Sequence, residues 1–505
     1  MKFSYKKTIY VGLAFLLIYA FWQAYDTLVP KILTDKFGLS QTASGAVMAL
    51  DNIVALVLLP LFGTLSDRCR SRLGRRTPYV LIGTLLAVVL LIPFGYADAL
   101  QAKNLEAISE DGEASLSVLW EANPEIRDPE SGDMMSLHEL FESKENFTSI
   151  PLYDANGDLN RDHADYVVPA RQAYAKSVTQ SHPFALLLFM GSLMLLLIAM
   201  SIFRSPAVAL MPDVTPRPLR SKANAVINLM GAIGGILILV FGILFGTGKA
   251  ENALMSYAPF FLAVGVLMLA SLIAFLALVR ERRLVKEMQQ ESERFGITEE
   301  EEDESEMHTH QPLPRAHRIS MILILISVVL WYMGYNAVSS KYSVYAGSVL
   351  GLDYNVTLIL AQAVAILAFV PIGMLSSRIG RRRMILVGVL MLGVAFGVFS
   401  FLRAGAPLLL VNILFVLGGI GWATINVNSF PMVVELCHAG DVGKYTGYYY
   451  TASMAAQTLT PVLSGLFLDG IGMSALFPYS FLCVALAFVT MFFVRHGDAE
   501  PTKNA

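Results

Sequence analysis

Two aspartates stand alone inside long apolar stretches of the sequence. Asp26 lies in "FWQAYDTLVP" and Asp51 lies in "MALDNIVAL". A charged side chain costs about 2.5–3.5 kcal/mol at the centre of a membrane helix, so a carboxylate in such a stretch is a functional candidate. A carboxylate that has lost its water binds a proton nearer neutral pH, and a second carboxylate nearby strengthens this effect. We therefore predict that Asp26 and Asp51 bind and release a proton. The alternative is that either one caps a helix end or faces water.

Arg204, in "IFRSPAVAL", is a third charged candidate. Its planar guanidinium could neutralise a carboxylate or donate hydrogen bonds to a polar ligand. It falls about 20 residues into its apolar stretch, and its long side chain could instead reach the membrane surface. Three further carboxylates stand at the ends of apolar stretches, where a gate or helix-end role is favoured: Asp213, Glu435 and Asp469.

The composition identifies the elements that must hold these residues. The chain is 55% hydrophobic and 15% charged, against about 25% charged in ordinary soluble proteins. Its net charge of −3 and pI near 6.3 argue against a nucleic-acid-binding protein. Apolar stretches of about 20 residues, each long enough to cross a bilayer, recur along the chain. The first extends from about 8 to 29, too long for a signal sequence. The sequence therefore predicts a multi-pass membrane protein.

We predict an all-α fold with twelve membrane spans. Their expected limits are about 8–30, 44–66, 77–97, 184–211, 222–246, 257–279, 319–345, 355–376, 383–402, 407–434, 444–468 and 473–494. On this division, residues 1–280 form a six-helix bundle with an insertion at about 98–183. Residues 281–318 form a linker, 319–496 a second six-helix bundle, and 497–505 a tail. Asp26 and Asp51 then lie about four and seven residues from the outer ends of their spans.

The distribution of Lys and Arg predicts the orientation. These residues gather at the N-terminus, in loop 67–76, near 217–222, in 280–286 and in 378–383. Because cytoplasmic loops are enriched in Lys and Arg, both termini are expected in the cytoplasm and the insertion outside the cell membrane. The run "EEEEDESE" in the linker is expected to be solvated and disordered.

The chain contains an internal repeat. "GTLSDRCRSRLGRR" follows the second span and "GMLSSRIGRRR" follows the eighth, with Gly63 and Gly373 in equivalent positions. The second copy lacks four residues and has Ser377 where the first has Asp67. Such a repeat is typical of two parallel six-span halves.

The repeated loop resembles the signature of the major facilitator superfamily. Its extended form, S-D-R-C-x-S-R-x-G-R-R-x-P, is similar to that of the proton-coupled sucrose and maltose symporters, which are related to the glycoside–pentoside–hexuronide:cation symporters. The stretches "ALMPDVTPRPLRSKANA", "WYMGYNAV", "NVNSFPMVVE" and "GYYYTASMAAQTLTPVLSG" agree with this resemblance. The resemblance covers most of the chain outside the insertion and the linker. It implies import of a glycoside, with a disaccharide such as sucrose or maltose as the expected substrate.

Two departures from these families bear on the coupling ion and on the substrate. The melibiose-permease-like branch places two sodium-binding carboxylates at positions that correspond here to Ala55 and Leu59. The resemblance therefore favours a proton as the coupling ion, with no other cofactor. In "RSPAVAL", Val208 stands where plant sucrose symporters have an arginine, and Arg204 lies one turn earlier.

Sugar binding calls for aromatic faces against the ring and for amides, hydroxyls or a guanidinium at its rim. Spans 1, 4, 7 and 10 line the central cavity in the superfamily that the chain resembles. The predicted substrate-binding residues lie on these spans and on span 11: Gln23, Tyr25, Arg204, Trp331, Tyr335, Asn336, Asn426, Asn428, Tyr449 and Gln457. Each aromatic residue could instead serve helix packing or the interfacial belt, and each amide could bond a neighbouring helix.

The arginine loop is predicted to act as a gate on the cytoplasmic side. Asp67 could face the positive N-terminus of span 11, near Lys444, and hold this side closed. Arg68, Arg75 and Arg76 complete the predicted gate. The alternative is that the loop only fixes the orientation of the chain.

A calcium-loop pattern occurs in the insertion. In "DANGDLNRDHAD" the ligand positions 1, 3, 5, 7, 9 and 12 are filled by Asp154, Asn156, Asp158, Asn160, Asp162 and Asp165. The glycine expected at position 6 is replaced by Leu159. A turn-rich acidic loop explains the pattern without metal, and calcium binding is the alternative.

Together these patterns predict a transporter that imports a glycoside with a proton by alternating access. No metalloprotease, phosphate-loop or nucleophile-elbow motif points to an enzyme. The expected partners are a small sugar and the lipid bilayer, with no nucleic acid, and the expected state is a monomer. Two alternatives stay open: an exporter or carrier of another solute, and a non-transporting sensor that uses the insertion as its receptor. Deletion of about 100–180 would abolish a sensor's function, whereas a transporter should keep some uptake.

Overall fold

A computed structural model describes residues 3–295, 315–436 and 442–496 of the chain. Long helices dominate it because backbone groups in a bilayer must find their hydrogen bonds within the chain. The first half contains α1 (Tyr5–Lys31), α2 (Gln41–Asp67), α3 (Thr77–Asn104), α8 (Phe184–Asp213), α9 (Arg220–Phe245) and α10 (Ala258–Leu278). The second half contains α12 (Arg315–Tyr345), α13 (Tyr354–Ile379), α14 (Arg381–Phe399), α15 (Leu408–Glu435), α16 (Val442–Ile471) and α17 (Leu476–Phe492).

These helices confirm the all-α membrane fold. Within the described residues, ten helices are long and apolar enough to cross a membrane. The other two long helices, α13 and α16, stand where the eighth and eleventh spans are predicted; the apolar stretch of α13 is shorter, at Tyr354–Phe369. Each half has its own apolar core: one is built from residues between Val11 and Val279, the other from residues between Met321 and Val494.

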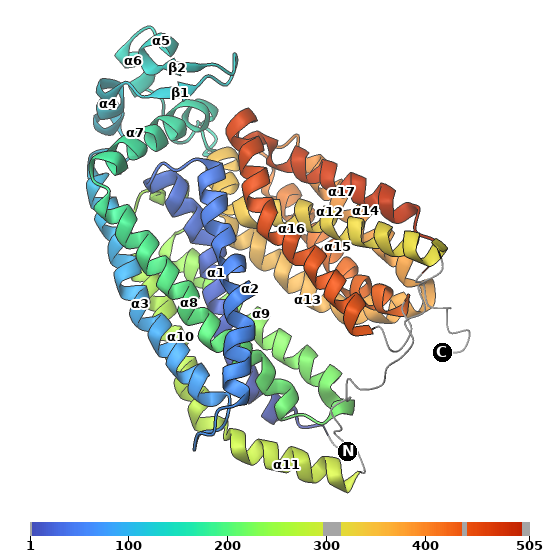
Figure 1. The fold of residues 1–505 in the computed structure, drawn as a ribbon. Helices are drawn as coiled ribbons and strands as arrows, with labels where there is room; N and C mark the ends of the chain where they lie inside the picture. The colour runs from blue at the N-terminus through green and yellow to red at the C-terminus, as the bar shows by residue number, and fades with distance from the viewer. Residues whose placement is uncertain (1–2, 296–314, 437–441, 497–505) are drawn as a thin grey trace.

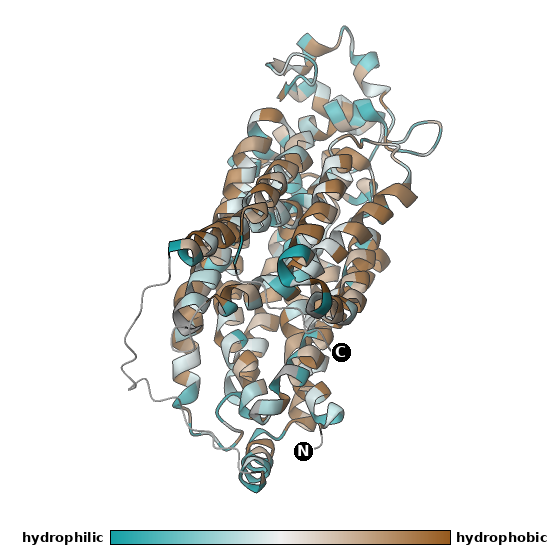
Figure 2. Ribbon diagram, turned by 90° about the vertical axis from the view of Figure 1, so that its right-hand side faces the viewer, coloured by the Kyte–Doolittle hydropathy of each residue, from teal (hydrophilic) through white to brown (hydrophobic). Residues whose placement is uncertain are grey.

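The two bundles lie side by side beneath a small domain formed by the insertion (Figure 1). We call the face that carries this domain the outer face, and the face that carries the arginine loop and the start of α1 the inner face. Brown, apolar residues prevail along the bundles, and teal, hydrophilic residues gather in the insertion and at the inner ends of helices (Figure 2). This distribution fits bundles that lie in lipid, with the outer domain and the inner ends of their helices in water.

The insertion folds into a compact outer domain. Its elements are α4 (Glu113–Ala122), an antiparallel hairpin of β1 (Glu125–Arg127) and β2 (Met134–Ser136), α5 (Leu137–Leu140), α6 (Lys144–Thr148), a π-helical turn η3 (His163–Val167) and α7 (Val168–Ser181). Its apolar core includes Leu119, Phe147 and Val167. The predicted start near 98 was too early, because α3 continues through a buried Asp98 to Asn104.

Part of the predicted linker is also structured. Helix α11 (Glu281–Arg294) follows α10 on the inner face, and Leu284 packs against the core of the first half. The acidic run at 299–306 lies outside the described residues.

The internal repeat is visible in the outer ends of α1 and α12. Each helix continues into a π-helical turn: η1 (Ile32–Lys36) after α1, and η6 (Ala346–Leu350) after α12. Each turn closes with one hydrogen bond of 2.9 Å, from Leu39 N to Leu33 O in the first half and from Leu352 N to Ala346 O in the second. The residues that follow the turns, Gly38 and Gly351, have φ of +62° and +67°. Both positions favour glycine, because side chains disfavour this left-handed conformation.

The two halves meet through polar contacts at their outer ends. The carboxylate of Asp469, in the last turn of α16, accepts hydrogen bonds from the backbone N–H groups of Gln41 and Thr42 at 2.7 and 2.8 Å. It therefore caps the first turn of α2 from the other half of the molecule. The buried Lys341 ammonium of α12 donates to Gln41 O at 2.8 Å.

A second outer contact joins α9 to α13. The Thr247 hydroxyl after α9 lies 2.9 Å from the Tyr354 hydroxyl, and both side chains are buried. Helices α2 and α16 also approach each other closely, since a Cβ on Gly45 of α2 would overlap Pro461 O of α16. The structure is therefore closed between the halves at its outer face.

Candidate functional site

Three charged side chains of the first half converge at its centre. Asp26 on α1 and Asp51 on α2 lie within electrostatic range of each other and of Arg204 on α8. Asp26 is exposed, and Asp51 and Arg204 are half-buried. Because α1 continues through η1 to Lys36, Asp26 lies about 15 Å from the outer end, and Asp51 lies equally deep in α2. Both carboxylates thus lie deeper in their helices than the sequence predicts, which places Asp26 about four residues and Asp51 about seven residues from the outer end.

Arg204 turns inward to this group. Its guanidinium carbon lies 5.1 Å from the centre of the Trp22 ring, where a cation–π interaction is favourable. Its electrostatic partners are Asp51, Tyr19 and Asp26, in that order of strength. The alternative that Arg204 reaches the membrane surface is therefore not what the structure shows.

The second half contributes an aromatic pair opposite these charges. The rings of Tyr335 on α12 and Trp422 on α15 stack in parallel, with centroids 3.7 Å apart and an interplanar angle of 2°. Tyr332 meets the same indole edge-on, with centroids 5.2 Å apart. Tyr335 lies within electrostatic range of Asp26, which places the pair next to the charged group of the first half.

An amide pair joins the two halves near this group. Gln362 Nε2 on α13 donates to Gln23 Oε1 on α1 at 2.6 Å. Both side chains are half-buried. A Cβ on Gly235 of α9 would lie 3.3 Å from an oxygen of each amide, so the glycine leaves room for the pair. We call Asp26, Asp51, Arg204, the Tyr335–Trp422 stack and the Gln23–Gln362 pair the central site.

Three further predicted amides are half-buried on the second half: Asn336, Asn426 and Gln457. Asn426 and Gln457 each donate to a carbonyl one turn back on their own helix, at 3.1 and 3.3 Å. Asn336 Nδ2 is buried and has no hydrogen-bond partner. These three side chains keep unused hydrogen-bonding capacity for a polar ligand.

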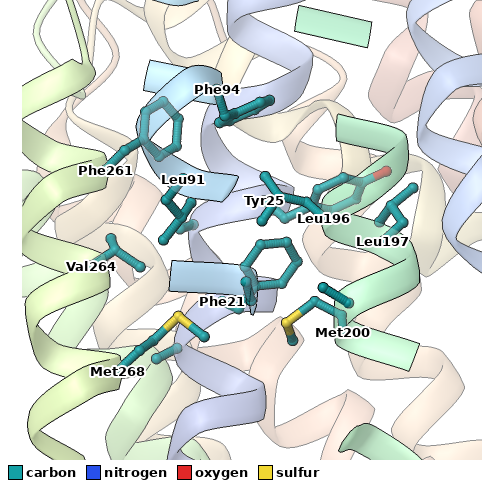
Figure 3. Close-up of a cluster of buried hydrophobic side chains, with 14 of the residues drawn as sticks. Phe21, Tyr25, Leu91, Phe94, Leu196, Leu197, Met200, Phe261, Val264 and Met268 are labelled. Atoms are coloured by element: carbon teal, nitrogen blue, oxygen red, sulfur yellow. The ribbon is translucent and has the colours of Figure 1, made fainter. Parts of the chain in front are cut away.

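Four other predicted ligand residues are packed inside the bundles. Tyr25 lies in the apolar core of the first half among Phe21, Phe94 and Leu196 (Figure 3). Trp331 is fully buried in the core of the second half, and Asn428 and Tyr449 are 1% and 4% exposed. Tyr449 shares a hydrogen bond of 2.9 Å with Ser429, and Asn428 bonds its own helix at 2.8 Å. The prediction that these four contact substrate is revised, because packing occupies their surfaces.

The arginine loop is fastened to its own half. The buried Arg76 side chain forms ion pairs with Asp67 and with Asp213 at the end of α8, the latter at 2.8 Å. Arg75 reaches Asp213 at 3.4 Å, and Arg68 is exposed. Burial alone would lower the pKa of Arg76, but hydrogen bonds and charges from Asp213 and Asp67 outweigh it and raise the pKa. The predicted contact of Asp67 with the start of α16 belongs to a conformation closed at the inner face and stays a prediction.

The second half repeats this fastening. Arg381, in the second copy of the loop, forms an ion pair of 2.6 Å with Glu435 at the end of α15. Helices α8 and α15 are the fourth and tenth spans, so the two ion pairs occupy equivalent positions in the repeat. Asp213, Glu435 and Asp469 thus all act at helix ends, as their places in the sequence indicate.

In the insertion, side chains of the calcium-loop pattern make hydrogen bonds within the loop itself. Asp154 Oδ1 accepts hydrogen bonds from the N–H groups of Asn156 and Asp158, and Asn160 Oδ1 accepts from Asp162 N. Asp165 pairs with Arg161 at 3.3 Å. The polar side chains therefore shape the turn. Within the part of the chain that the structure describes, no three His, Cys, Asp or Glu side chains gather where they could hold a metal ion.

Two members of the central site, Trp422 and Gln362, were not predicted from the sequence. Trp422 lies one turn before the predicted ligand residue Asn426 in "GWATINVN". This spacing, which places both residues on one face of the helix, is the sequence signal that could have identified Trp422. Gln362 stands alone in the apolar stretch "LILAQAVAIL" and signals a polar contact within a span. The pairing of Gln362 with Gln23 across the halves depends on tertiary packing.

Two repeated helical bundles that share a central polar site define a secondary transporter fold. A family model described as "Major Facilitator Superfamily" matches residues 175–370 and 356–505, together more than half of the chain. A second model, described as "MFS/sugar transport protein", matches residues 10–97. The chain belongs to the Major Facilitator Superfamily.

Short segments of the chain are similar to proteins named as sugar transporters or as a glycoside/cation symporter. The sucrose transport protein SUC3 of Arabidopsis thaliana is 34% identical over 70 residues, which cover 14% of this chain and 11% of that protein. The putative glycoside/cation symporter YagG of Escherichia coli is 38% identical over 74 residues, 15% of each chain. The human proton-associated sugar transporter A is 42% identical over 77 residues, 15% of this chain and 10% of that protein. These matches thus span less than a sixth of each relative.

Solved structures share the whole fold. The inward-open xylose transporter XylE from E. coli superposes with a TM-score of 0.57 at 13% identity, covering 98% of this chain and 97% of that one. A bacterial homologue of the iron transporter ferroportin in its inward-facing state gives 0.59 at 13% identity, covering 97% and 99%. At these identities the likeness shows the fold alone.

Proposed function

We propose that this protein imports a glycoside together with a proton, and that the glycoside is a disaccharide such as sucrose or maltose. One observation supports this most directly: ionisable carboxylates with an arginine on the first half face a stacked aromatic pair on the second half. A proton-coupled sugar carrier needs a proton-binding group and a sugar-binding surface close enough to influence each other. The central site supplies both across the line where the halves meet.

The charged group would bind the proton. With both carboxylates ionised, Asp26 and Asp51 repel each other, and Arg204 can neutralise only one of them. Protonation of one carboxylate removes this excess negative charge, so the first half can then close around the site with fewer unpaired charges. Asp26 is exposed in this conformation, which allows its proton to pass to water.

The aromatic pair and the amides would bind the sugar. The C–H face of a pyranose ring fits against the negative face of an aromatic ring, and Trp422 and Tyr335 would each offer the face that does not lie against the other ring. Gln23, Gln362 and Asn336 can donate to and accept from the hydroxyl groups at the rim of the ring. Because these groups come from both halves, a bound sugar would connect the halves as they rock about the central site.

The segmental similarity to sucrose transport proteins, a putative glycoside/cation symporter and a proton-associated sugar transporter supports this substrate class. We propose in addition that the protein is a monomer in the plasma or inner membrane, with both termini in the cytoplasm and a proton as its only coupling ion. We further propose that the two six-helix bundles comprise residues 1–280 and residues 319–496.

Purified protein in liposomes with an internal pH-sensitive dye tests this function. Sucrose, maltose, glucose and a non-sugar control are added outside in turn. Interior acidification with one glycoside, and none with the control, is the expected result. Exchange of labelled sugar without a pH change would instead indicate a uniporter or another coupling ion. Neither signal with any glycoside would contradict the proposal and favour an exporter, another solute or a sensor.

A further inference from the structure

The outer domain is attached firmly to the first half. Helix α3 runs without interruption from the bundle into the domain, and α7 leads back into α8. Gln101 on α3 donates to Thr179 on α7 at 3.0 Å and to Lys36 O at 2.8 Å. A Cβ on Gly38, after η1, would overlap the backbone of α7 at Gln172 and Lys176. The domain must therefore move with the first half.

The same domain also touches the second half at an equivalent position. Gly351 follows η6 as Gly38 follows η1, and a Cβ on Gly351 would overlap the side chain of Leu159 in the outer domain. Leu159 is only 3% exposed, although it lies at a turn in an acidic stretch. A Cβ on Gly405 of the second half would lie 3.4 Å from Asp158 Oδ2. One turn of the domain thus packs on two glycines of the second half.

Arg127, at the end of β1, makes a second contact with the second half. Its guanidinium donates to Gly470 O at 2.8 Å and to Asp469 O at 3.2 Å. Both carbonyls lie in the last turn of α16, where they lack partners within the helix and where a positive charge is favourable. A further bond to Gly132 O, at 3.2 Å, orients the guanidinium within the hairpin.

The Arg127 contact adds to the bond that closes the outer face. The Asp469 side chain caps the start of α2, while the carbonyl of the same residue accepts from Arg127. The end of α16 is therefore held between two parts of the first half. When the outer ends of the bundles separate, the domain moves away with the first half, and the contacts of Leu159 and Arg127 must break.

From these contacts we infer that the outer domain is a latch that holds the outer face closed, through Arg127 on the end of α16 and Leu159 on Gly351. The latch stabilises the outward-closed conformation over the outward-open one. It shifts this equilibrium without touching the central site, so it is independent of the nature of the substrate and of the coupling ion.

The distance between the outer ends of the bundles tests the latch. Spin labels are attached at Lys249→Cys, after α9, and at Phe401→Cys, after α14; both positions are exposed. The three native cysteines are first replaced by serine. Double electron–electron resonance in nanodiscs then reports the populations of short and long outer distances, with no sugar or proton gradient needed.

Arg127→Ala is expected to raise the ratio of long to short distances about twofold to fivefold, as loss of an exposed charge-assisted contact implies. Leu159→Asp is expected to raise it at least as much, because it places a charge in a buried contact. The matched control is Arg161→Ala, because Arg161 is exposed and pairs with Asp165 inside the domain. It should leave the ratio unchanged. Protection of α7 from hydrogen exchange verifies that each variant domain is folded.

Unchanged ratios in both folded variants would overturn the latch, and so would an equal shift in Arg161→Ala. Since the measurement uses no substrate, failure of the latch leaves the proposed sugar symport standing. Failure of sugar symport likewise leaves the latch testable.

Discussion

At the scale of residues, the central site divides its chemistry between the halves. Ionisable groups stand on α1, α2 and α8, and the stacked aromatic pair stands on α12 and α15. A substitution among the ionisable groups should therefore affect proton coupling more than sugar binding, and a substitution in the aromatic pair should affect sugar binding more than proton coupling.

Trp422→Ala should weaken sugar binding. The indole provides the largest apolar face of the central site, and aromatic contacts of this kind are worth about 0.5–1.5 kcal/mol beyond area burial. We expect the KM for sugar uptake to rise about tenfold, with a smaller rise for Trp422→Phe. The matched control is Trp331→Phe: this indole is fully buried in the core, so its loss should lower Tm and leave KM unchanged. An unchanged KM in Trp422→Ala would remove Trp422 from the site.

Asp26, Asp51 and Arg204 could be predicted as functional residues because a lone charge in an apolar stretch is costly. Their relation to one another could not, since the register of three helices decides it. Tyr25 and Trp331, in contrast, were predicted to contact substrate but are packed in the apolar cores. An aromatic residue near a polar one reads the same in sequence whether it faces the core or the ligand, and only packing separates the two. Trp422 was missed for that reason, and Gln362 was missed because its pairing with Gln23 of the other half depends on tertiary packing.

At the scale of elements, one buried carboxylate fixes the start of α3. Glu281, the first residue of α11, accepts hydrogen bonds from the N–H groups of Arg75, Arg76 and Thr77 at 2.6, 3.1 and 2.8 Å. It is 2% exposed, and a Cβ on the neighbouring Gly74 would overlap it. The linker helix thus caps a membrane helix.

Glu281→Ala should destabilise the protein. It leaves buried N–H groups without a charged acceptor, which costs about 1.5–3 kcal/mol. Glu287→Gln, one and a half turns later, removes ion pairs with Lys7 and Arg283 that are partly exposed and worth at most about 1 kcal/mol. Thermal unfolding followed by intrinsic fluorescence should show a clear drop in Tm for Glu281→Ala and little change for Glu287→Gln. Equal drops would show that Glu281 is not a cap.

The outer domain should lose stability in acid. Burial lowers the pKa of His163, although the hydrogen bond to Asp111 acts in the opposite direction. The folded domain therefore holds fewer protons at this site than the unfolded chain, whose histidine has a pKa of about 6.5. The stabilisation is complete above that pH and is lost as the pH falls below it.

Hydrogen exchange in α7 at about pH 7.5 and about pH 5.5 checks this, after correction for the intrinsic exchange rate. Protection should fall in acid for the native domain and fall less in His163→Gln, which cannot take up the proton. An identical fall in both would assign the acid sensitivity to other groups. Asp111 is one candidate: burial would raise its pKa, but hydrogen bonds from His163 and Arg171, with their charges, lower it. Its contribution is lost in stronger acid.

At the scale of the whole molecule, the repeat predicts two opposed helix caps. Asp469, near the end of α16, caps the start of α2 in this outward-closed structure. Asp67 ends α2 in the first half and is predicted to cap the start of α16 when the inner face closes. The fold class, the repeat and the arginine loop were predictable because composition and spacing carry them. The contacts between the halves were not, since they join residues 107 to 428 positions apart in the sequence.

Asp469→Asn and Asp67→Asn should therefore shift the conformational equilibrium in opposite directions. Loss of charge at a helix N-terminus costs about 0.3–1 kcal/mol, enough to change the ratio of populations about twofold to fivefold. With labels at Lys249→Cys and Phe401→Cys, Asp469→Asn should populate the long outer distance and Asp67→Asn should deplete it. A shift in the same direction for both would contradict the paired caps.

The carboxylates of the first half are proposed to couple a proton to sugar movement, and a comparison of two variants in liposomes tests this coupling. Asp26→Asn and Asp51→Asn are assayed for sugar-driven acidification and for exchange of labelled sugar at equal concentrations on both sides. We predict that at least one variant loses acidification while exchange persists, because exchange needs the sugar surface and no net proton transfer. Full acidification in both variants would show that neither carboxylate couples the proton to sugar movement.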